Sequence, residues 1–308
     1  MSVYTPISHT RMSQLLDDYG FRLVQYQGAS HGIENSTFLI DAQDRHGQPC
    51  ALVMTVFETL KADALAPYLH LLSQLADGGH LPVPAPLPNG GGQWLSEVDG
   101  KPAMLMPRLP GSHDFEVDEH RCRQVGALLA RLHQCDTRTL LPLPDERQRL
   151  TALSEQLPCL PDADQITART VLQNWQTRPA GHTLIHADLF RDNLLWQDGR
   201  ISALLDFYNA CLDLPEYDLA VTLNDWCVDE QGRPVAEREA GLLSAYREQG
   251  GQVDETCLQE ALAVAALRFW LSRLAGPVAE HSEGQGSKNP EEFARIYRWR
   301  ARALTPDV

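Results

Sequence analysis

The sequence predicts an α+β fold of two lobes. We expect a small N-terminal lobe with a five-stranded antiparallel sheet and one helix, followed by a larger, mainly helical lobe. Three observations predict this division. Short stretches with strand character dominate the first third of the chain, apolar residues at helical spacing dominate the rest, and a segment with two prolines and a glycine, residues 104–111, separates them. The expected lobes are therefore residues 1–108 and 109–308.

The sheet of the small lobe is expected from stretches rich in Val, Ile, Met and Thr that are bounded by turn residues. A loop with two glycines, residues 28–36, separates the first two strands, and a turn at residues 44–47 precedes the third. A hairpin with its turn at Asp99-Gly100 supplies the last two. The first three expected strands are residues 19–27, 37–40 and 51–57.

One helix is expected within this lobe, over residues 62–76. Leu65, Tyr68, Leu69 and Leu72 share its buried face, and Gly78-Gly79 marks its end. In residues 81–86 every second residue is proline, which cannot continue a helix. We therefore expect this segment to form an extended connector.

The rest of the chain is mainly helical in character. The first predicted helix contains Val125, Leu128, Leu129 and Leu132 as a buried stripe. Residues 145–180 are expected to form helices joined by loops. A loop at residues 284–287 precedes the last helix. The later helices are expected at residues 218–226, 237–247, 258–274 and 291–303.

A segment in the middle of this helical part carries the chemistry. It reads His186-Ala187-Asp188-Leu189-Phe190-Arg191-Asp192-Asn193, and Asp206-Phe207-Tyr208 follows it after a predicted hairpin. The hairpin pairs residues 194–196 with residues 200–205 across an Asp198-Gly199 turn. It therefore places Asn193 and Asp206 at the same end of one ladder.

This spacing fits the needs of phosphoryl transfer from ATP. A carboxylate must accept the proton of the attacking hydroxyl, and two oxygen ligands must hold Mg²⁺ against the phosphates. Asp188 fits the base, and Asn193 and Asp206 fit the metal ligands. His186 is expected to brace the loop by hydrogen bonds. We therefore expect a two-lobed, protein-kinase-like fold with ATP between the lobes. A metal-dependent hydrolase that uses His186, Asp188 and Asp206 is the alternative.

The glycine loop is the expected phosphate-binding loop. Backbone N–H groups of such loops contact ATP phosphates, although glycine and serine are also common in ordinary hairpin turns. Met106 lies in the segment that separates the two lobes, residues 104–111, and is also expected to bind ATP. The other ATP-binding candidates are Gly28, Ser30, Gly32, Asn35 and Ser36.

The third strand lacks the lysine that grips the ATP phosphates in many kinases. The whole chain contains three lysines. Lys288 lies too far along the chain, so Lys61, Lys101 or an arginine such as Arg108 is expected to substitute. The missing lysine also keeps open a non-catalytic nucleotide-binding module.

Composition limits the partners. A formal net charge of −15 over 308 residues argues against nucleic acid and anionic membranes, since both attract basic surfaces. Seven cysteines without a Cys-x-x-Cys pair indicate reduced thiols. No stretch has the length and apolar character of a signal peptide or a membrane span, so we expect a cytoplasmic protein.

Several segments together resemble one family. The catalytic segment resembles the aminoglycoside and choline kinase-like phosphotransferases, and the match to type II homoserine kinases runs nearly end to end. Its most discriminating parts are Asp206-Phe207-Tyr208 and Leu223-Asn224-Asp225-Trp226-Cys227. That family also resembles this chain in having threonine where other kinases have the strand lysine. The matching segments are residues 32–35, 54–58, 81–84, 107–111, 185–193, 205–208 and 217–227.

The resemblance implies ATP-dependent phosphorylation of the L-homoserine side-chain hydroxyl. The substrate carboxylate then needs a cationic partner, and bidentate arginine suits it. The candidates are Arg191, which also stands beside the catalytic Asp188, and Arg268 and Arg273. Another acceptor, such as an aminoglycoside, choline or a sugar, is the alternative. Further pocket candidates are Tyr208, Asp225 and Trp226, of which the two aromatics are as well explained by core packing, while Asp218 is expected to brace the catalytic loop.

Overall fold

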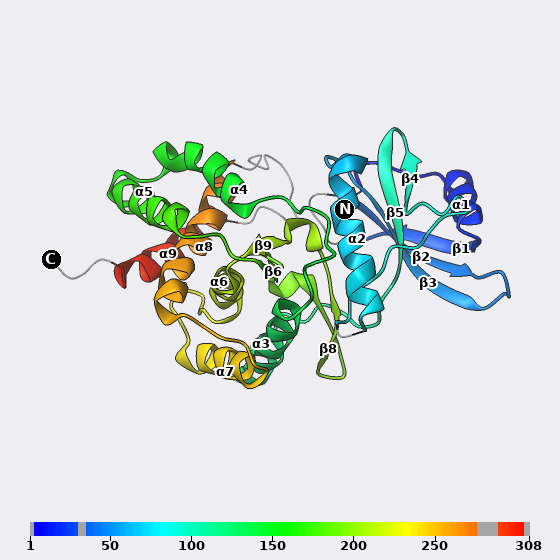
Figure 1. Ribbon diagram of the computed structural model, residues 1–308. Coiled ribbons are helices and arrows are strands. Elements are labelled where there is room, and N and C mark those ends of the chain that lie inside the picture. The colour runs from blue at the N-terminus through cyan, green and yellow to red at the C-terminus, as the bar shows by residue number, and fades with distance from the viewer. Residues whose placement is uncertain (1–2, 30–34, 80, 276–288, 305–308) are drawn as a thin grey trace.

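Two lobes lie side by side in the molecule (Figure 1). The computed structural model describes residues 3–29, 35–79, 81–275 and 289–304. The small lobe contains α1 (His9–Asp18), β1 (Arg22–Gly28), β2 (Ser36–Gln43), β3 (Pro49–Val56), α2 (Ala62–Asp77), β4 (Leu95–Val98) and β5 (Lys101–Pro107).

The sheet of the small lobe is antiparallel throughout, with strand order β1-β2-β3-β5-β4. Alternate residues of β2 are buried, so Phe38 and Ile40 face one apolar core and Leu39 faces the opposite side. Helix α1 packs on that core through Met12 and Leu16. Helix α2 stands between the sheet and the larger lobe (Figure 1). The five-stranded sheet expected from the sequence is confirmed.

Helix α1 corrects two expectations. The described residues of the small lobe contain two helices rather than one, and Tyr19, expected to begin the first strand, is the C-cap residue of α1. Ser8 caps the other end by accepting a hydrogen bond from the backbone N–H of Arg11. Met12, Leu15 and Leu16 form the buried face, a short stripe at helical spacing.

The larger lobe is built mainly from helices. Two short antiparallel sheets, β6-β9 and β7-β8, carry the segment with the catalytic motif. Its elements are α3 (Glu119–His133), α4 (Glu146–Leu153), η1 (Ser154–Cys159), α5 (Asp162–Thr177), β6 (Thr183–Ile185), η2 (Arg191–Asn193), β7 (Leu194–Gln197), β8 (Arg200–Leu204), η3 (Phe207–Asn209), β9 (Cys211–Asp213), α6 (Pro215–Trp226), α7 (Ala236–Glu248), α8 (Glu255–Ala275) and α9 (Pro290–Arg302).

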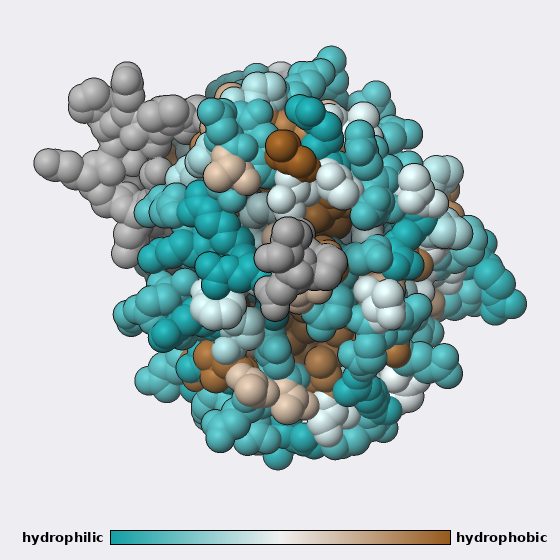
Figure 2. All heavy atoms as spheres, turned by 90° about the vertical axis from the view of Figure 1, so that its left-hand side faces the viewer, coloured by the Kyte–Doolittle hydropathy of each residue, from teal (hydrophilic) through white to brown (hydrophobic). Residues whose placement is uncertain are grey.

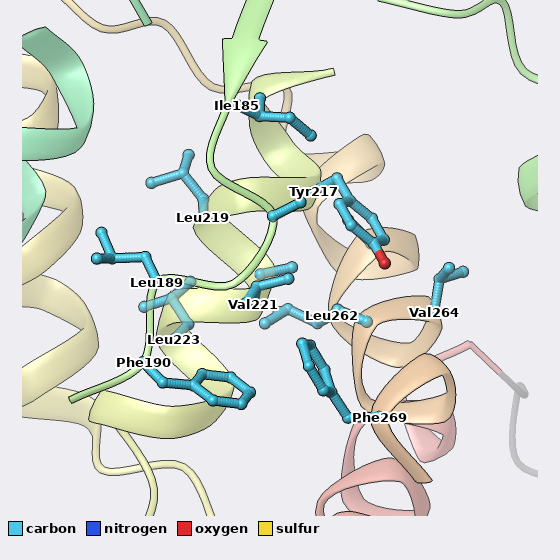
Figure 3. Packing of buried hydrophobic residues seen from close by; sticks show 14 of the residues in the cluster. Ile185, Leu189, Phe190, Tyr217, Leu219, Val221, Leu223, Leu262, Val264 and Phe269 are labelled. Carbon is cyan, nitrogen blue, oxygen red and sulfur yellow. The ribbon is translucent and has the colours of Figure 1, made fainter. Parts of the chain in front are cut away.

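Helix α6 forms the centre of this lobe. Ten of its twelve residues are buried, and Figure 3 shows Leu219, Val221 and Leu223 on this helix, next to Leu189 and Phe190 of the catalytic segment. Phe190 from the segment packs near Phe269 from α8, with ring centroids 4.6 Å apart. The catalytic segment is therefore fixed on a rigid helical core.

The helices and the hairpin expected in the larger lobe are present, with ends shifted by a few residues. The β6-β9 pair is an addition that the sequence did not predict. The expected loop at residues 284–287 lies outside the described residues, and the division at residue 108 stays a prediction. Hydrophilic residues cover most of the face seen in Figure 2, with apolar residues in small groups. None of the described helices combines the length and the apolar character needed to cross a membrane.

Candidate active site

The catalytic segment begins where β6 ends, and helix α6 holds it in place. The Asp218 carboxylate on α6 accepts hydrogen bonds from the backbone N–H groups of His186 and Ala187, both at 2.8 Å. Ala187 adopts a left-handed conformation with φ of 60°. That conformation turns the chain sharply so that Asp188 follows directly at the surface of the core.

Asp218 is fully buried and is also tied to helix α3. Nε2 of His133 donates to it at 3.1 Å, and the Tyr246 hydroxyl contacts Nδ1 of the same ring at 2.8 Å. Burial opposes ionisation, but the hydrogen bonds from the His133 side chain and from the backbone N–H of His186 help to outweigh it, so the pKa of Asp218 lies below its usual value. The expected brace is confirmed as a hydrogen-bonded anchor.

His186 links the two loops of the site. Its ring is completely buried, and Nε2 donates to the backbone oxygen of Leu205 at 2.8 Å, just before Asp206. Phe207 packs edge-on against the ring, with centroids 4.7 Å apart. Burial lowers the pKa of His186 despite the nearby Asp218, so the ring is neutral at pH 7. These contacts fit the bracing role expected of His186.

Asp188 is half-buried and is held through both its backbone and its side chain. The Asn193 side chain donates from Nδ2 to the backbone oxygen of Asp188 at 2.8 Å. The Asn209 side chain donates from Nδ2 to Oδ2 of Asp188 at 3.2 Å. The predicted base is therefore fixed in a defined orientation, as general-base chemistry requires.

Asn193 and Asp206 lie at the same end of the β7-β8 hairpin, as the sequence predicted. Leu194 pairs with Leu204, and the backbone N–H of Leu205 donates to the oxygen of Asn193 at 2.9 Å. Asp206 adopts a left-handed conformation, with φ of 61° and ψ of 63°, and its side chain is exposed. The ladder thus brings an amide and a carboxylate to one edge beside Asp188.

These two side chains fit a divalent cation held jointly with a nucleotide. Both offer hard oxygen donors, and the Asn193 amide is oriented because its Nδ2 already donates to Asp188. No group of three or more His, Cys, Asp and Glu suited to a metal occurs in the described parts of the chain. Mg²⁺ at a phosphate site needs only one or two protein oxygens, with phosphates and water completing its shell.

Arg191 and Asp225, two of the predicted substrate-binding residues, contact each other. Arg191 donates to Asp225 from its backbone N–H at 2.8 Å, from Nε at 3.1 Å and from Nη2 at 3.2 Å. Burial lowers the pKa of Arg191, but the charge of Asp225 outweighs it and the pKa is raised. Trp226 is fully buried, with Nε1 donating to the oxygen of Leu189 at 3.3 Å. Its position fits core packing.

Tyr208 joins the two lobes. It packs edge-on against Phe57 at the end of β3 and Tyr68 on α2, with centroids 5.1 and 5.8 Å apart. Burial, with the charge of Asp206 beside it, raises the pKa of Tyr208, so its hydroxyl stays protonated at pH 7. The ring therefore couples the Asp206 turn to the small lobe.

The two later arginines differ in their surroundings. Arg268 is 6% exposed and lies near Glu146 and Asn209 on the side of Asp188. Arg273 donates to the oxygen of Asn289 at 2.9 Å and to Glu292 at 2.7 Å, which ties α8 to α9. The structure thus brings Arg268 into the neighbourhood of the predicted base, whereas Arg273 contacts residues at the start of α9.

The ATP-binding candidates lie on the small lobe where the structure describes them. Gly28 ends β1, and Asn35 accepts at Oδ1 from the backbone N–H of Glu58 at 3.3 Å. Ser30 and Gly32 lie outside the described residues. Met106 stands beside Val53, and Val53 beside Leu39, in the antiparallel register. These three half-buried side chains form an apolar row on the sheet face opposite α1, a platform suited to a flat base.

The three residues expected to replace the missing strand lysine differ in their surroundings. Lys101 forms an ion pair with Glu58 and donates to Thr5 at 2.7 Å. Arg108, which directly follows β5, pairs with Asp41 on β2 at 2.7 Å, and Lys61 is the exposed N-cap residue of α2. Hydrogen bonds to Lys101, Ser36 and Thr5 overcome burial and hold the pKa of Glu58 below its usual value.

Sequence reasoning missed three kinds of residue in this region. Leu39 and Val53 were visible only as strand residues, and Glu58 stood at the end of the matching segment 54–58 without a role assigned to it. Asn209 follows Asp206 by three residues, and that proximity was its only sequence signal. The roles of all these residues in binding and catalysis stay predictions.

Comparison with known proteins shows which family the chain matches. The pattern described as "Phosphotransferase enzyme family" matches residues 25–251, which include the catalytic segment and most of both lobes. The chain belongs to this family.

Two similar relatives of this phosphotransferase are proteins named homoserine kinase. The one from Pseudomonas aeruginosa is 36% identical over 305 residues, which cover 95% of this chain and 94% of the relative. The one from Cupriavidus pinatubonensis is 34% identical over 337 residues, which cover 100% of this chain and 98% of the relative. The similarity therefore extends over both lobes.

The fold of the phosphotransferase is shared with solved structures. An amicoumacin kinase, solved with AMP-PNP, Ca²⁺ and amicoumacin, superimposes with a TM-score of 0.69 at 14% identity, covering 97% of this chain and 95% of the other. That similarity shows the fold alone. It confirms the two-lobed, protein-kinase-like fold predicted from the sequence.

Proposed function

We propose that this phosphotransferase is a homoserine kinase, which transfers the γ-phosphoryl group of ATP to the side-chain hydroxyl of L-homoserine. The observation that carries the proposal is the similarity, over nearly the whole chain, to proteins named homoserine kinase. The arrangement of Asp188, Asn193 and Asp206 at one edge of the larger lobe supports it. The product, O-phospho-L-homoserine, fits a role in threonine biosynthesis.

Residues of this chain account for the proton transfer and for the orientation of the catalytic carboxylate. Asp188 accepts the proton of the homoserine hydroxyl while the hydroxyl oxygen forms a bond to the γ-phosphorus. The bond from that phosphorus to the bridging oxygen of ADP breaks. Because His186 and Asp218 fix the loop, Asp188 requires little reorganisation to reach the attacking hydroxyl.

The lobes divide this work. Residues 1–108 bind ATP, with Met106 and the apolar row beside it under the base, and with the loop from Gly28 to Ser36 over the phosphates. Residues 109–308 carry catalysis and acceptor binding. This division is supported by the position of α2 and Tyr208 between the lobes. A cytoplasmic location fits a biosynthetic kinase that uses ATP.

Asn193 and Asp206 are the proposed ligands of Mg²⁺. The cation, when bound, neutralises charge on the β- and γ-phosphates. We expect EDTA to abolish activity and Mg²⁺ to restore it. We also expect Asp206→Asn to raise the Mg²⁺ concentration for half-maximal activity at least about tenfold, because it removes a charged ligand. Titration of ADP release against Mg²⁺ measures this. An unchanged half-maximal concentration would exclude Asp206 as a ligand.

The acceptor's amino-acid group is proposed to bind beside Arg191 and Asp225. A hollow of about 560 Å³ opens beside Arg191, and Arg238, Asp229 and Glu230 also line it. Groups of both charges suit a zwitterion, with a guanidinium for its carboxylate and a carboxylate for its ammonium. Only part of the Arg191 side chain, 32%, is exposed, so substrate contacts there are partly shielded from water.

We expect Arg191→Met to raise the KM for homoserine about tenfold or more, because a charge-assisted contact to the carboxylate is lost. The KM for ATP should change little. Steady-state kinetics with each substrate varied in turn separates the two effects. Arg200→Met, at an exposed arginine on β8, is the matched control. If both variants keep the wild-type KM for homoserine, the carboxylate is bound elsewhere, and Arg268 and Arg273 are the next residues to test.

The proposed function is tested by ADP release with a panel of acceptors. The panel contains L-homoserine, L-serine, choline, a hexose and kanamycin, each with ATP and Mg²⁺. Preferred turnover of homoserine, with O-phospho-L-homoserine identified by mass spectrometry, is the expected result. Preferred turnover of another acceptor would identify that compound, instead of homoserine, as the substrate. ATP binding without turnover of any acceptor would indicate a nucleotide-binding module instead.

A further inference from the structure

Two side chains behind Asp188 are linked to it by hydrogen bonds, and the phosphoryl transfer described above does not use them. Asn209, at the end of η3, donates from Nδ2 to Oδ2 of Asp188 at 3.2 Å. The other end of the same amide, Oδ1, accepts from Nη2 of Arg268 at 3.2 Å. The three residues come from the catalytic segment, the Asp206 turn and helix α8, so tertiary packing alone brings them together.

Arg268 fixes which way the Asn209 amide points. A guanidinium carries only hydrogen-bond donors, so the amide must turn its oxygen toward Arg268. Its NH₂ group then faces the opposite direction, where the Asp188 carboxylate lies. With a solvent-exposed partner, the amide would be able to flip and present its oxygen to the carboxylate, which would repel it. The direction of the donor is thus set by a charge that cannot be lost.

Arg268 is itself held rigidly. It is 6% exposed, its guanidinium lies 4.0 Å from the ring centre of Phe269, and its Nε is 3.4 Å from Oε1 of Glu146. Glu146 is completely buried and accepts from the Tyr217 hydroxyl at 2.8 Å. A buried charge is costly unless it is paired and fixed. Figure 3 shows Phe269 on α8 and Tyr217 on α6, whereas Glu146 begins α4.

We propose that Asn209 is a positioning residue for the catalytic base, oriented from behind by Arg268. By donating to Oδ2, Asn209 fixes the plane of the Asp188 carboxylate in the geometry that meets the acceptor hydroxyl. The inference rests on the proposed phosphoryl transfer but not on homoserine as the acceptor. It also assigns Arg268 a function distinct from binding the substrate carboxylate.

The first test is Asn209→Ala. We expect kcat to fall about 10- to 100-fold, because a misplacement of about 1 Å of a catalytic group costs up to about 10²-fold in rate. The KM values for ATP and acceptor and the Mg²⁺ requirement should stay within about twofold of the wild type. Asn209→Asp should be at least as slow, since a second carboxylate repels Asp188. The control is Asn174→Ala, at an exposed asparagine on α5.

A double-mutant cycle separates positioning from a structural effect. If Asn209 acts through Asp188, adding Asn209→Ala to Asp188→Asn should lower the residual rate less than about twofold. A purely structural role would lower it by the same 10- to 100-fold as in the wild-type background. Circular dichroism and ATP affinity verify that each variant is folded. Equal effects in both backgrounds, or a wild-type kcat for Asn209→Ala, would overturn the inference.

Failure of the proposed function would give a different experimental result. In that case the wild type transfers phosphate to no acceptor of the panel, whatever residue stands at position 209. The same cycle is then measured on the slow hydrolysis of ATP, in which water replaces the acceptor and Asp188 still accepts its proton. Loss of that hydrolysis in Asn209→Ala only when Asp188 is present would support the inference, and equal loss without Asp188 would refute it.

Discussion

Asp188→Asn is expected to lower kcat about 10²- to 10⁴-fold, the range typical for loss of a general base. The change keeps the size of the side chain and its contact with Asn209, which is 3.2 Å long in the wild type. An amide cannot accept the proton of the acceptor hydroxyl at neutral pH. Because the group acts in the transition state, the KM values for ATP and homoserine should change little.

The matched control for this prediction is Asp198→Asn. Asp198 lies in the turn between β7 and β8 with φ of 52°, a left-handed conformation that asparagine also adopts. Its variant undergoes the same chemical change ten residues further along the chain and should keep wild-type kinetics. Steady-state ADP release with both substrates varied makes the comparison. A kcat for Asp188→Asn within a few-fold of the wild type would remove Asp188 from the reaction.

Asp218→Asn is expected to destabilise the protein by about 3–5 kcal/mol, although Asp218 does not touch the substrate. The carboxylate accepts two backbone N–H groups, from His186 and Ala187, and a third hydrogen bond from His133. Asparagine offers one acceptor oxygen and places an NH₂ group against a donor. At least one buried donor therefore loses its partner, and the catalytic segment loses its anchor.

The unfolding free energy of this variant is measured by urea titration followed by circular dichroism. Asp77→Asn, at an exposed position that ends α2, is the control and should stay within about 0.5 kcal/mol. Because the folded pKa of Asp218 lies below the usual 3.8, its contribution is present above that pH. The contribution is lost as pH falls further, so the variant should lose this part of the acid sensitivity. Stability equal to wild type would show that the brace is dispensable.

Much of the fold was predictable because its signals are local. The hairpin was predicted from two apolar stretches around Asp198-Gly199, whose residues adopt the positive φ that such turns need. The helix with Val125 and Leu129 was predicted from spacing alone. Helix α1 was missed because its buried stripe is short. The β6-β9 pair was missed because three-residue strands carry no periodic pattern.

The candidate site was predictable where it follows chain spacing. Asp188, Asn193 and Asp206 became the candidates because phosphoryl transfer dictates their types and a hairpin dictates their proximity. The pairing of Arg191 with Asp225 was not predictable, since 34 residues separate them and each had been considered alone. Asn209 and Arg268 were likewise unconnected, because they stand 59 positions apart in the chain.

The sequence by itself determined the reaction class, the two-lobed architecture and the region that carries the proposed base and the proposed metal ligands. Each depends on residue types at short, fixed spacing, which turns and strand registers convert directly into geometry. Only the tertiary structure decided how that segment is held. Asp218 anchors its backbone, His186 ties it to the Asp206 loop, and Asn209 with Arg268 orients its carboxylate. Such contacts depend on how α6 and α8 pack, and helix packing joins residues whose separation in the chain carries no signal.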